Sequence, residues 1–400
     1  MSAAPNQQRV TATGIAAWQM PSLIIGILGL IASAIGWFMD KPQFYRAYLP
    51  AYIFWFQIVA GALAVLCLQY ITGGEWGILI RRPLGAAART MMWMALFFVP
   101  IAAGIPYIYP WADASYVAHE PSVQLKAGYL NTQSFLIRAA VYFALWILWA
   151  WRIRALSLRF YEDRSPYTEL ARRRWAATGL PMIVLTLTFA AIDWMMSTEP
   201  KWTSSMYGIN FIVAAGLSAY AFVTFFLTRL TGSSAMSDIV KPSHFRDLGN
   251  LMLAFVMLYA YTAFSEYLLS WYANLHEEIP HFISRQSGVW GVFALLVVVF
   301  HFFLPFFMLL MRAIKDRPGT IGVVAVIILV IRFIAIYWMT QPSFTGAQFY
   351  FSWMTIAALA GIGGLWLFLF IGQLKGQTII PIHETWVEEA VREGALKINA

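Results

Sequence analysis

The segment GTIGVVAVIILVIRFIAIYWM, residues 319–339, decides the fold class, because its only charged side chain is that of Arg332. An α-helix of about 20 apolar residues crosses the roughly 30 Å hydrocarbon core of a bilayer. The sequence therefore predicts an all-α integral membrane protein with about ten transmembrane helices. The nine other predicted spans are 18–39, 51–72, 90–109, 132–151, 178–197, 204–230, 248–275, 288–312 and 350–373. The third span is the least regular, because Pro100, Gly104 and Pro106 interrupt it.

The composition favours a membrane protein over a soluble or nucleic-acid-binding one. The 400 residues are 60% hydrophobic and 12% charged, whereas a soluble domain is about half apolar and a quarter charged. The net charge of +8 comes mostly from Lys and Arg in short loops, and such residues set membrane topology. We therefore expect lipid around the chain and no nucleic-acid partner.

The distribution of basic residues predicts the orientation. With ten spans, the segments on the side of the two termini carry 20 of the 27 Lys and Arg residues, and the opposite loops carry 5. Such a bias places both termini in the cytoplasm. The chain then divides into a cytoplasmic segment 1–17, a ten-helix membrane domain 18–373 and a cytoplasmic amphipathic tail 374–400.

Five ionisable side chains lie inside the predicted spans, where a charge is costly and usually marks a functional path or a buried pair. These are Arg138, Asp193, Glu266, His301 and Arg332. One interpretation is structural pairing that holds helices together, with Arg138 and Glu199 as ion-pair candidates. The other is a proton relay or polar ligand site that uses at least one of the acids. By residue count, the acids lie toward the non-cytoplasmic side and His301 and Arg332 near the middle, so an acid–His–Arg track is possible.

Hydroxyl-bearing residues share a helix face with each acid, at about 100° per residue. On the seventh span the stripe consists of Tyr259, Thr262, Glu266 and Ser270, and on the fifth span of Thr186, Asp193 and Ser197. Such stripes can carry a water wire or only interhelical hydrogen bonds. The proton-transfer candidates are therefore Asp193, Glu266, His301, Arg332, Thr186, Tyr259 and Thr262. Glu277 and Glu278 follow the seventh span, where we expect a solvated or partner-facing loop.

No pattern predicts a metal centre, a haem or a catalytic residue in this chain. The single cysteine, Cys67, cannot form an internal disulfide or hold an iron–sulfur cluster. Of six histidines, only His301 lies well inside a span, and a membrane haem usually needs two. No zinc spacing, nucleophile motif or phosphate-binding loop occurs. The aromatic content of 17% is compatible with a cleft that binds a quinone.

Three motifs on successive helices resemble a known family. They are AIDWMMSTEPKWTSSMYG (191–208), FSEYLLSWYANLHEEIPHFISR (264–285) and HFFLPFFMLL (301–310). Together they are similar to the large membrane subunits of bacterial alternative complex III, a quinol:electron-acceptor oxidoreductase, and more closely to the second of these subunits. Those subunits belong to the NrfD-like superfamily of polysulfide and nitrite reductase membrane subunits.

The resemblance implies a fold, a location and partners. The expected fold has two four-helix bundles, spans two to five and six to nine, flanked by outer helices. The expected location is the bacterial cytoplasmic (inner) membrane. The expected partners are a paralogous membrane subunit, an iron–sulfur subunit, c-type haem subunits and small membrane subunits. The resemblance is compatible with menaquinone or another quinone as a ligand of this chain, without requiring it.

Three functions remain in competition. The first is a membrane subunit without redox centres that moves or gates protons during quinol oxidation. The second is a quinol-binding subunit with a site near the periplasmic side, where Glu266 or Asp193 takes the quinol proton as a general base. The third is a secondary transporter whose buried charges bind substrate, but the chain lacks clearly paired half-helices around a midplane site. The resemblance favours the first, with Asp193, Glu266, His301 and Arg332 on the proton path.

Overall fold

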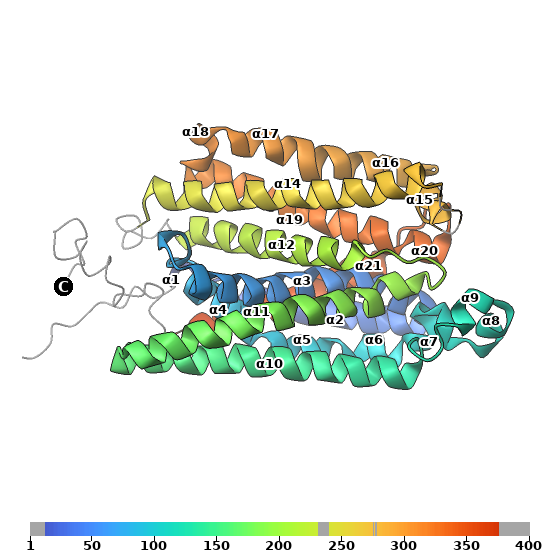
Figure 1. Ribbon diagram of the computed structural model, residues 1–400, viewed down its shortest axis with the longest axis horizontal. Helices are drawn as coiled ribbons and strands as arrows, with labels where there is room; N and C mark the ends of the chain where they lie inside the picture. Colours follow the sequence, from blue (N-terminus) through green and yellow to red (C-terminus); the bar gives the residue numbers. More distant parts are fainter. Residues whose placement is uncertain (1–12, 231–239, 275, 277, 376–400) are drawn as a thin grey trace, which may run out of the picture.

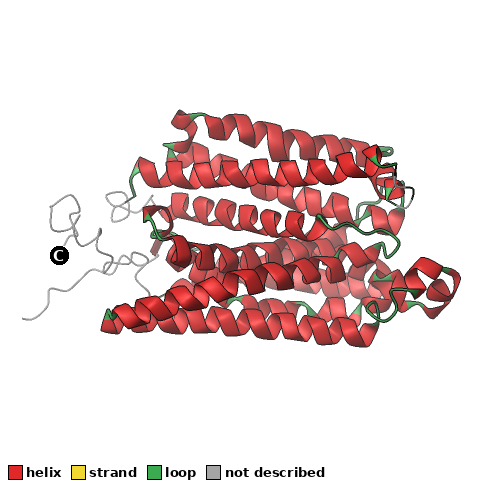
Figure 2. Cartoon of the chain, in the orientation of Figure 1, coloured by secondary structure: helices red, strands yellow, loops and turns green. Residues whose placement is uncertain are grey.

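The computed structural model describes residues 13–230, 240–274, 276 and 278–375 (Figure 1). These residues fold into helices joined by short loops, and no β-strand occurs among them (Figure 2). Ten helical segments in this described part are long and apolar enough to cross a membrane. The prediction of an all-α, multi-pass membrane protein is therefore confirmed.

The helices correspond to the predicted spans, although α3, α10 and α11 extend well beyond the apolar runs. The unbroken spanning helices are α2 (Gln19–Met39), α3 (Lys41–Thr72), α10 (Thr132–Asp163), α11 (Pro166–Trp194), α12 (Tyr207–Leu230), α14 (Pro242–Tyr272), α19 (Pro318–Thr340) and α21 (Trp353–Leu374). Two spans consist of shorter pieces: α4 (Arg81–Arg89), α5 (Met91–Phe97) and α6 (Val99–Ala103), and α16 (Val289–Val297), η4 (Val298–Phe303) and α17 (Leu304–Leu310).

Short helices fill most of the connections. They are α1 (Thr13–Ala16), η1 (Glu75–Gly77), α7 (Ile105–Ile108), η2 (Pro110–Ala112), α8 (Ala114–His119), α9 (Pro121–Gln124), η3 (Met196–Thr198), α15 (Ile279–Gln286), α18 (Arg312–Lys315) and α20 (Pro342–Thr345). The predicted amphipathic tail lies outside the described residues from position 376 onward, as do the first 12 residues of the predicted N-terminal segment.

The third span is broken where the sequence predicts interruption. Pro100 has no N–H to continue the helical ladder, and α5 and α6 are separate helices on either side of Phe98. The neighbouring helix α3 supplies hydrogen bonds at this place, since the Tyr48 hydroxyl donates to the carbonyl oxygen of Phe97 at 2.8 Å. The broken backbone is thus tolerated because it is buried against protein and satisfied there.

The spanning helices form two four-helix bundles and an outer pair (Figure 1). In the first bundle, α3 packs against α4 and α11, and α10 packs against α11 and α5. In the second, α12 packs against α14 and α19, and the segment α16–η4–α17 packs against both α14 and α19. Helices α3 and α12 join the two bundles. This is the arrangement that the resemblance implies.

Small residues dock the outer pair, α2 and α21, against each other. Gly29 is so close to α21 that an added Cβ would overlap the backbone nitrogen of Gly361. Helices in lipid associate through such close backbone approach, because burial from water gives no driving force there. The described ends of the chain therefore meet at one end of the molecule, where Lys375 Nζ lies 3.5 Å from Gln19 Oε1.

The opposite end of the molecule is called the distal end below. It carries the short helices α7, α8, α9, α15 and α20, which cap the bundles (Figure 1). Helix α14 runs toward it and ends at Tyr272, six residues after Glu266. At 1.5 Å per residue, Glu266 therefore lies about 9 Å along the helix axis from that end.

Candidate functional site

The structure divides the predicted site residues between the two bundles. Asp193, Arg138 and Thr186 lie in the first bundle, on α10 and α11. The second bundle holds another group, which lines one cavity. That group consists of Glu266, His301, Arg332 and Tyr259. A single acid–His–Arg track that includes Asp193 is therefore not formed by direct contacts among the described residues.

Asp193 is a fully paired carboxylate. Its side chain is buried and accepts two hydrogen bonds of 2.9 Å from Arg138, one from Nε and one from Nη2. The Tyr142 hydroxyl donates to the same carboxylate at 3.0 Å. A bidentate Arg–carboxylate pair fixes geometry as well as charge. Asp193 and Arg138 thus tie α11 to α10.

Aromatic side chains fill the first bundle around this pair. The ring of Trp194 packs against Phe56, Phe98 and Phe143 at centroid distances of 4.9, 4.7 and 5.6 Å. Thr186 accepts a hydrogen bond of 2.8 Å from Trp146 Nε1. The interior here is close-packed, which leaves the Thr186 hydroxyl engaged with its neighbours rather than facing open space.

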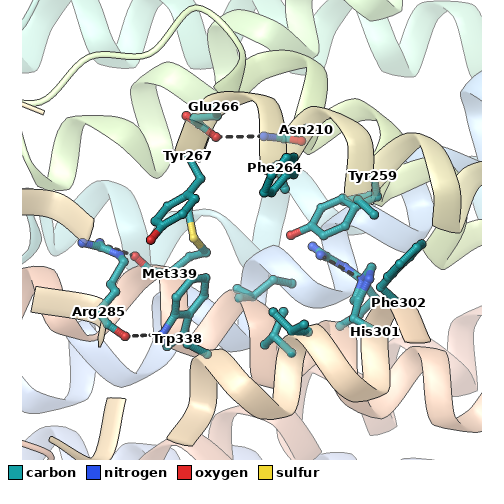
Figure 3. Close-up of a pocket in the computed structure, with 18 of the residues that line it drawn as sticks. Asn210, Tyr259, Phe264, Glu266, Tyr267, Arg285, His301, Phe302, Trp338 and Met339 are labelled. Atoms are coloured by element: carbon teal, nitrogen blue, oxygen red, sulfur yellow. Dashed lines mark hydrogen bonds between the residues drawn. The ribbon is translucent and has the colours of Figure 1, made fainter. Parts of the chain in front are cut away.

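The second bundle encloses a cavity of about 920 Å³, called the lateral cavity below. Its walls come from α12, α14, α15, α16, η4 and α19, with Gln57 of α3 in the first bundle (Figure 3). Tyr261 and Phe264 of α14 and Leu295 of α16 line it, each is more than half exposed, and α14 and α16 make few contacts with each other. The cavity therefore opens sideways between α14 and α16, on an apolar surface of the kind that faces lipid.

Glu266 lies in the cavity wall with half of its carboxylate unbonded. Oε2 accepts a hydrogen bond of 2.9 Å from Asn210 Nδ2, and the Thr262 hydroxyl donates to Asn210 Oδ1. Oε1 is buried and has no well-formed hydrogen bond within the described part of the chain, although the Ser204 hydroxyl lies close to the carboxylate. A buried polar atom without a partner costs about 1–3 kcal/mol. Glu266 is thus held in place by its neighbours but not satisfied by them.

A hydroxyl links the neighbourhood of Glu266 to the distal surface. Ser270 Oγ lies 3.1 Å from the carbonyl oxygen of Glu266 and 2.8 Å from Oε2 of Glu278. The sequence predicts a solvated or partner-facing role for Glu278, but its side chain is only half-exposed and folds back onto α14. Glu277, predicted to behave in the same way, lies outside the described residues.

His301 and Arg332 meet at the other end of the lateral cavity, beside Tyr259. Arg332 Nη1 lies 3.4 Å from His301 Nε2, and its guanidinium lies 5.0 Å from the Tyr259 ring. His301 belongs to η4, one turn of π-helix that precedes Pro305. Because Pro305 cannot donate to the carbonyl of His301, the backbone hydrogen-bond pattern changes from α-helical to π-helical at this point. Such π-turns are frequent at functional sites.

A buried ionic cluster at the distal end joins the two bundles. Glu199, which follows η3, accepts hydrogen bonds of 2.9 Å from Arg285 Nη2 and 2.6 Å from His281 Nδ1. Ser343 of α20 donates to the same carboxylate at 2.7 Å. The ring of Trp202 stacks on His281 at a centroid distance of 3.7 Å. Glu199 therefore lies in an ion pair, though with partners that the sequence did not suggest.

The protonation of this cluster follows from its burial. Burial and the adjacent Arg285 charge lower the pKa of His281 from 6.5 to about 4. Burial opposes ionisation of Glu199, but the hydrogen bond from His281 and the charge of Arg285 outweigh it and hold the pKa of Glu199 below its usual value. At neutral pH the cluster is thus a neutral imidazole donating to a carboxylate that Arg285 neutralises.

This protonation makes the stability of the protein depend on pH. Between pH 6.5 and about 4 the unfolded chain protonates His281 and the folded chain does not, so stability falls as pH falls. The shift corresponds to about 3 kcal/mol at most. We expect the thermal midpoint in detergent to drop between pH 7 and pH 4.5, and the His281→Gln variant to drop less. The exposed His119→Gln variant is the control and should keep the full slope; equal slopes in all three proteins would contradict the assignment.

Four residues of the site were missed from the sequence. Asn210 and Gln57 are uncharged and look like ordinary polar residues in a span. His281 and Arg285 lie between two predicted spans and so fall outside the set of intramembrane ionisable residues, but both are buried. The two residues follow Pro280 and are four positions apart, and in a helix that spacing would place both side chains on one face. This spacing is the sequence signal that could have identified them.

No group of three or more His, Cys, Asp or Glu side chains in the described residues is arranged to hold a metal ion. In the comparisons with known proteins, no family model matches the chain and no curated protein matches it significantly. The assignment of function therefore depends on the geometry of the lateral cavity and on the three sequence motifs.

Proposed function

We propose that this chain is a membrane subunit of a quinol:electron-acceptor oxidoreductase of the alternative complex III type, and that it takes quinol into the lateral cavity, with Glu266 as proton acceptor. One observation carries the proposal. Glu266, whose buried Oε1 has no hydrogen-bond partner among the described residues, lines a cavity that opens toward lipid. Quinol is a lipid-soluble molecule whose hydroxyl groups need such an acceptor.

The shape and lining of the cavity fit this ligand class. Small-molecule sites are typically about 300–1,000 Å³, mostly apolar, with a few placed polar groups. The lateral cavity has this size and is lined largely by aromatic and aliphatic side chains. A quinol would enter between α14 and α16 without leaving the bilayer. When bound, it supplies two electrons and two protons.

Glu266 can serve as a general base because of how its neighbours hold it. Asn210 fixes the orientation of the carboxylate through Oε2, and Oε1 is left to accept a proton from a bound hydroxyl. A positioned base of this kind typically contributes a factor of about 10²–10⁴. Toward the distal surface, Ser270 bridges the backbone carbonyl oxygen of Glu266 and Oε2 of Glu278, so a water between the Glu266 carboxylate and Ser270 would complete an exit for the proton.

A second candidate function is proton transfer without a bound quinol, which was the first expectation from the sequence. The observation in its favour is the row of polar groups Thr262, Asn210, Glu266, Ser270 and Glu278, in which Ser270 bonds the backbone carbonyl of Glu266 and a water would complete the link to its carboxylate. This set needs no ring ligand in order to conduct. In either case electrons pass to partner subunits, for which the resemblance supplies an iron–sulfur subunit, c-type haem subunits and a paralogous membrane subunit.

The proposed setting is the bacterial cytoplasmic membrane with both termini in the cytoplasm. The bias of 20 against 5 basic residues supports this orientation. The distal end would then face the periplasm, and Glu278 would release protons on that side. Quinol oxidation with outward proton release contributes to a transmembrane proton gradient.

A photoreactive quinone analogue tests the location of the site. In the assembled complex, we expect it to label α14 and α16, and unlabelled quinol to compete. Ala263→Trp, which adds a large ring to the cavity wall, should lower labelling at least tenfold. Ala254→Trp lies on the same helix, exposed and outside the cavity lining, and should leave labelling unchanged. Labelling only of another subunit, or labelling insensitive to Ala263→Trp, contradicts the proposal.

A further inference from the structure

Arg332 is a cation buried in the middle of a membrane helix. It lies 14 residues after the start of α19 and 8 residues before its end, and only 3% of its surface is exposed. Arginine stays charged in proteins. A charge at this depth costs about 2.5–3.5 kcal/mol on insertion scales and usually has a partner.

The partners of Arg332 in the described residues are all neutral. Nη2 donates to Gln57 Oε1 at 3.0 Å. Nη1 lies 3.4 Å from His301 Nε2, and because a guanidinium can only donate, that nitrogen must be an acceptor and the imidazole neutral. Nε is buried without any hydrogen-bond partner among the described side chains. No carboxylate of the described residues forms an ion pair with it.

This situation differs from that of the two arginines described above. Arg138 has Asp193, and Arg285 has Glu199. The acid that shares the lateral cavity with Arg332 is Glu266, but it lies two helical turns along α14 from Tyr259, about 10 Å. Figure 3 shows Tyr259 beside His301, away from Glu266. The cavity thus has an acidic end and a separate cationic end.

The cationic end is accessible to a ligand. Arg332, Gln57, His301 and Tyr259 all line the lateral cavity, and its opening lies on the lipid-facing side. A ligand that arrives from the bilayer must carry an apolar body. A ligand that neutralises a guanidinium best carries an oxygen anion, which accepts charge-assisted hydrogen bonds about twice as strong as neutral ones.

We propose that Arg332, supported by Gln57 and His301, binds an oxyanion carried on an apolar molecule. Two sources supply this chemistry: the carboxylate of a long-chain fatty acid, and the ionised hydroxyl of an acidic ring compound such as a hydroxyquinone. The inference does not depend on the proposed function, because Arg332 needs a counter-charge whatever Glu266 serves.

The test uses the full-length chain, with any partners that co-purify, in nanodiscs of zwitterionic lipid. The probe is a long-chain fatty acid with a photoreactive group on its tail, and its methyl ester is the uncharged match. We expect the acid to label the lateral cavity at least tenfold more than the ester. Arg332→Gln should lower labelling by the acid at least tenfold, and Arg332→Lys should restore part of it. Arg246→Gln, which breaks a pair with Asp316 far from the cavity, is the control and should label as wild type.

Competition separates the two sources. An alkyl hydroxynaphthoquinone that displaces the acid, while its methyl ether does not, identifies the ring anion as a ligand of the same site; failure of both to displace it identifies the carboxylate alone. Equal labelling by acid and ester, or unchanged labelling in Arg332→Gln, overturns the inference and leaves Arg332 as a helix-packing residue bonded to Gln57. Glu266→Gln should leave labelling by the acid intact, so failure of the proposed quinol site is recognised separately.

Discussion

Glu266→Gln is expected to lower the rate of quinol oxidation by about 10²–10⁴-fold in the assembled complex, because an amide cannot take the proton that a general base removes. The substitution keeps the size of the side chain and its contact with Asn210. The complex should therefore assemble in normal amounts, and the binding of a quinone analogue should change by less than tenfold. The measurement is quinol:acceptor turnover per assembled complex, together with proton release on each side of reconstituted vesicles.

A surface acid provides the matched control. Glu169 of α11 pairs with Arg172 and Arg173, and its side chain is 29% exposed. Glu169→Gln should keep turnover within twofold of wild type. If Glu266→Gln does the same for both turnover and proton release, the proposed role of Glu266 is wrong. If turnover persists while proton release on the distal side is lost, proton transfer without quinol binding is the correct function.

Asp193→Leu is expected to have a large effect of the opposite kind, on folding rather than on turnover. It leaves the Arg138 charge without its carboxylate in the interior of the first bundle. Breaking a buried pair in this way costs about 3–5 kcal/mol, and we expect a value near the lower end because 19% of the Arg138 side chain is exposed. The measurements are the yield of monodisperse protein and its thermal midpoint in detergent.

A double substitution distinguishes pairing from a specific need for an acid. Arg138→Met together with Asp193→Leu removes both charges and keeps comparable volume. Replacement of a buried pair by apolar residues is often neutral or stabilising, so the double variant should be more stable than Asp193→Leu alone. Where the double variant folds but turnover is lost, Asp193 has a functional role that its complete pairing does not suggest.

The two acids show what a sequence can reveal about buried charge. Asp193 and Glu266 look alike as isolated acids on apolar helices with hydroxyl stripes, and both were candidates for the same proton path. The structure gives Asp193 a bidentate arginine and a tyrosine hydroxyl, and gives Glu266 one amide and an open cavity. The difference comes from residues 55 and 56 positions away along the chain, namely Arg138 for Asp193 and Asn210 for Glu266. No local pattern encodes it.

The ionic cluster at the distal end also depends on contacts that no local sequence pattern reveals. Arg285 and His281 follow a span and precede the next one, so a local interpretation places them in a solvated loop. In the fold, α15 packs at the distal end of the second bundle, and Glu199 at the end of the first bundle forms hydrogen bonds with its side chains. Residues more than 80 positions apart thus form one ionic cluster, and its depth lowers the pKa of His281.

The sequence by itself determined the all-α membrane architecture, the ten spans and the break at Pro100. The reason is that lipid imposes local rules: each span needs about 20 apolar residues, and each backbone group must be satisfied within its own helix or by an adjacent one. The tertiary structure decided which buried charge is paired, which faces a cavity and where that cavity opens. Such differences depend on which helices pack together, because a counter-charge acts over a few ångströms in space and is indifferent to distance along the chain.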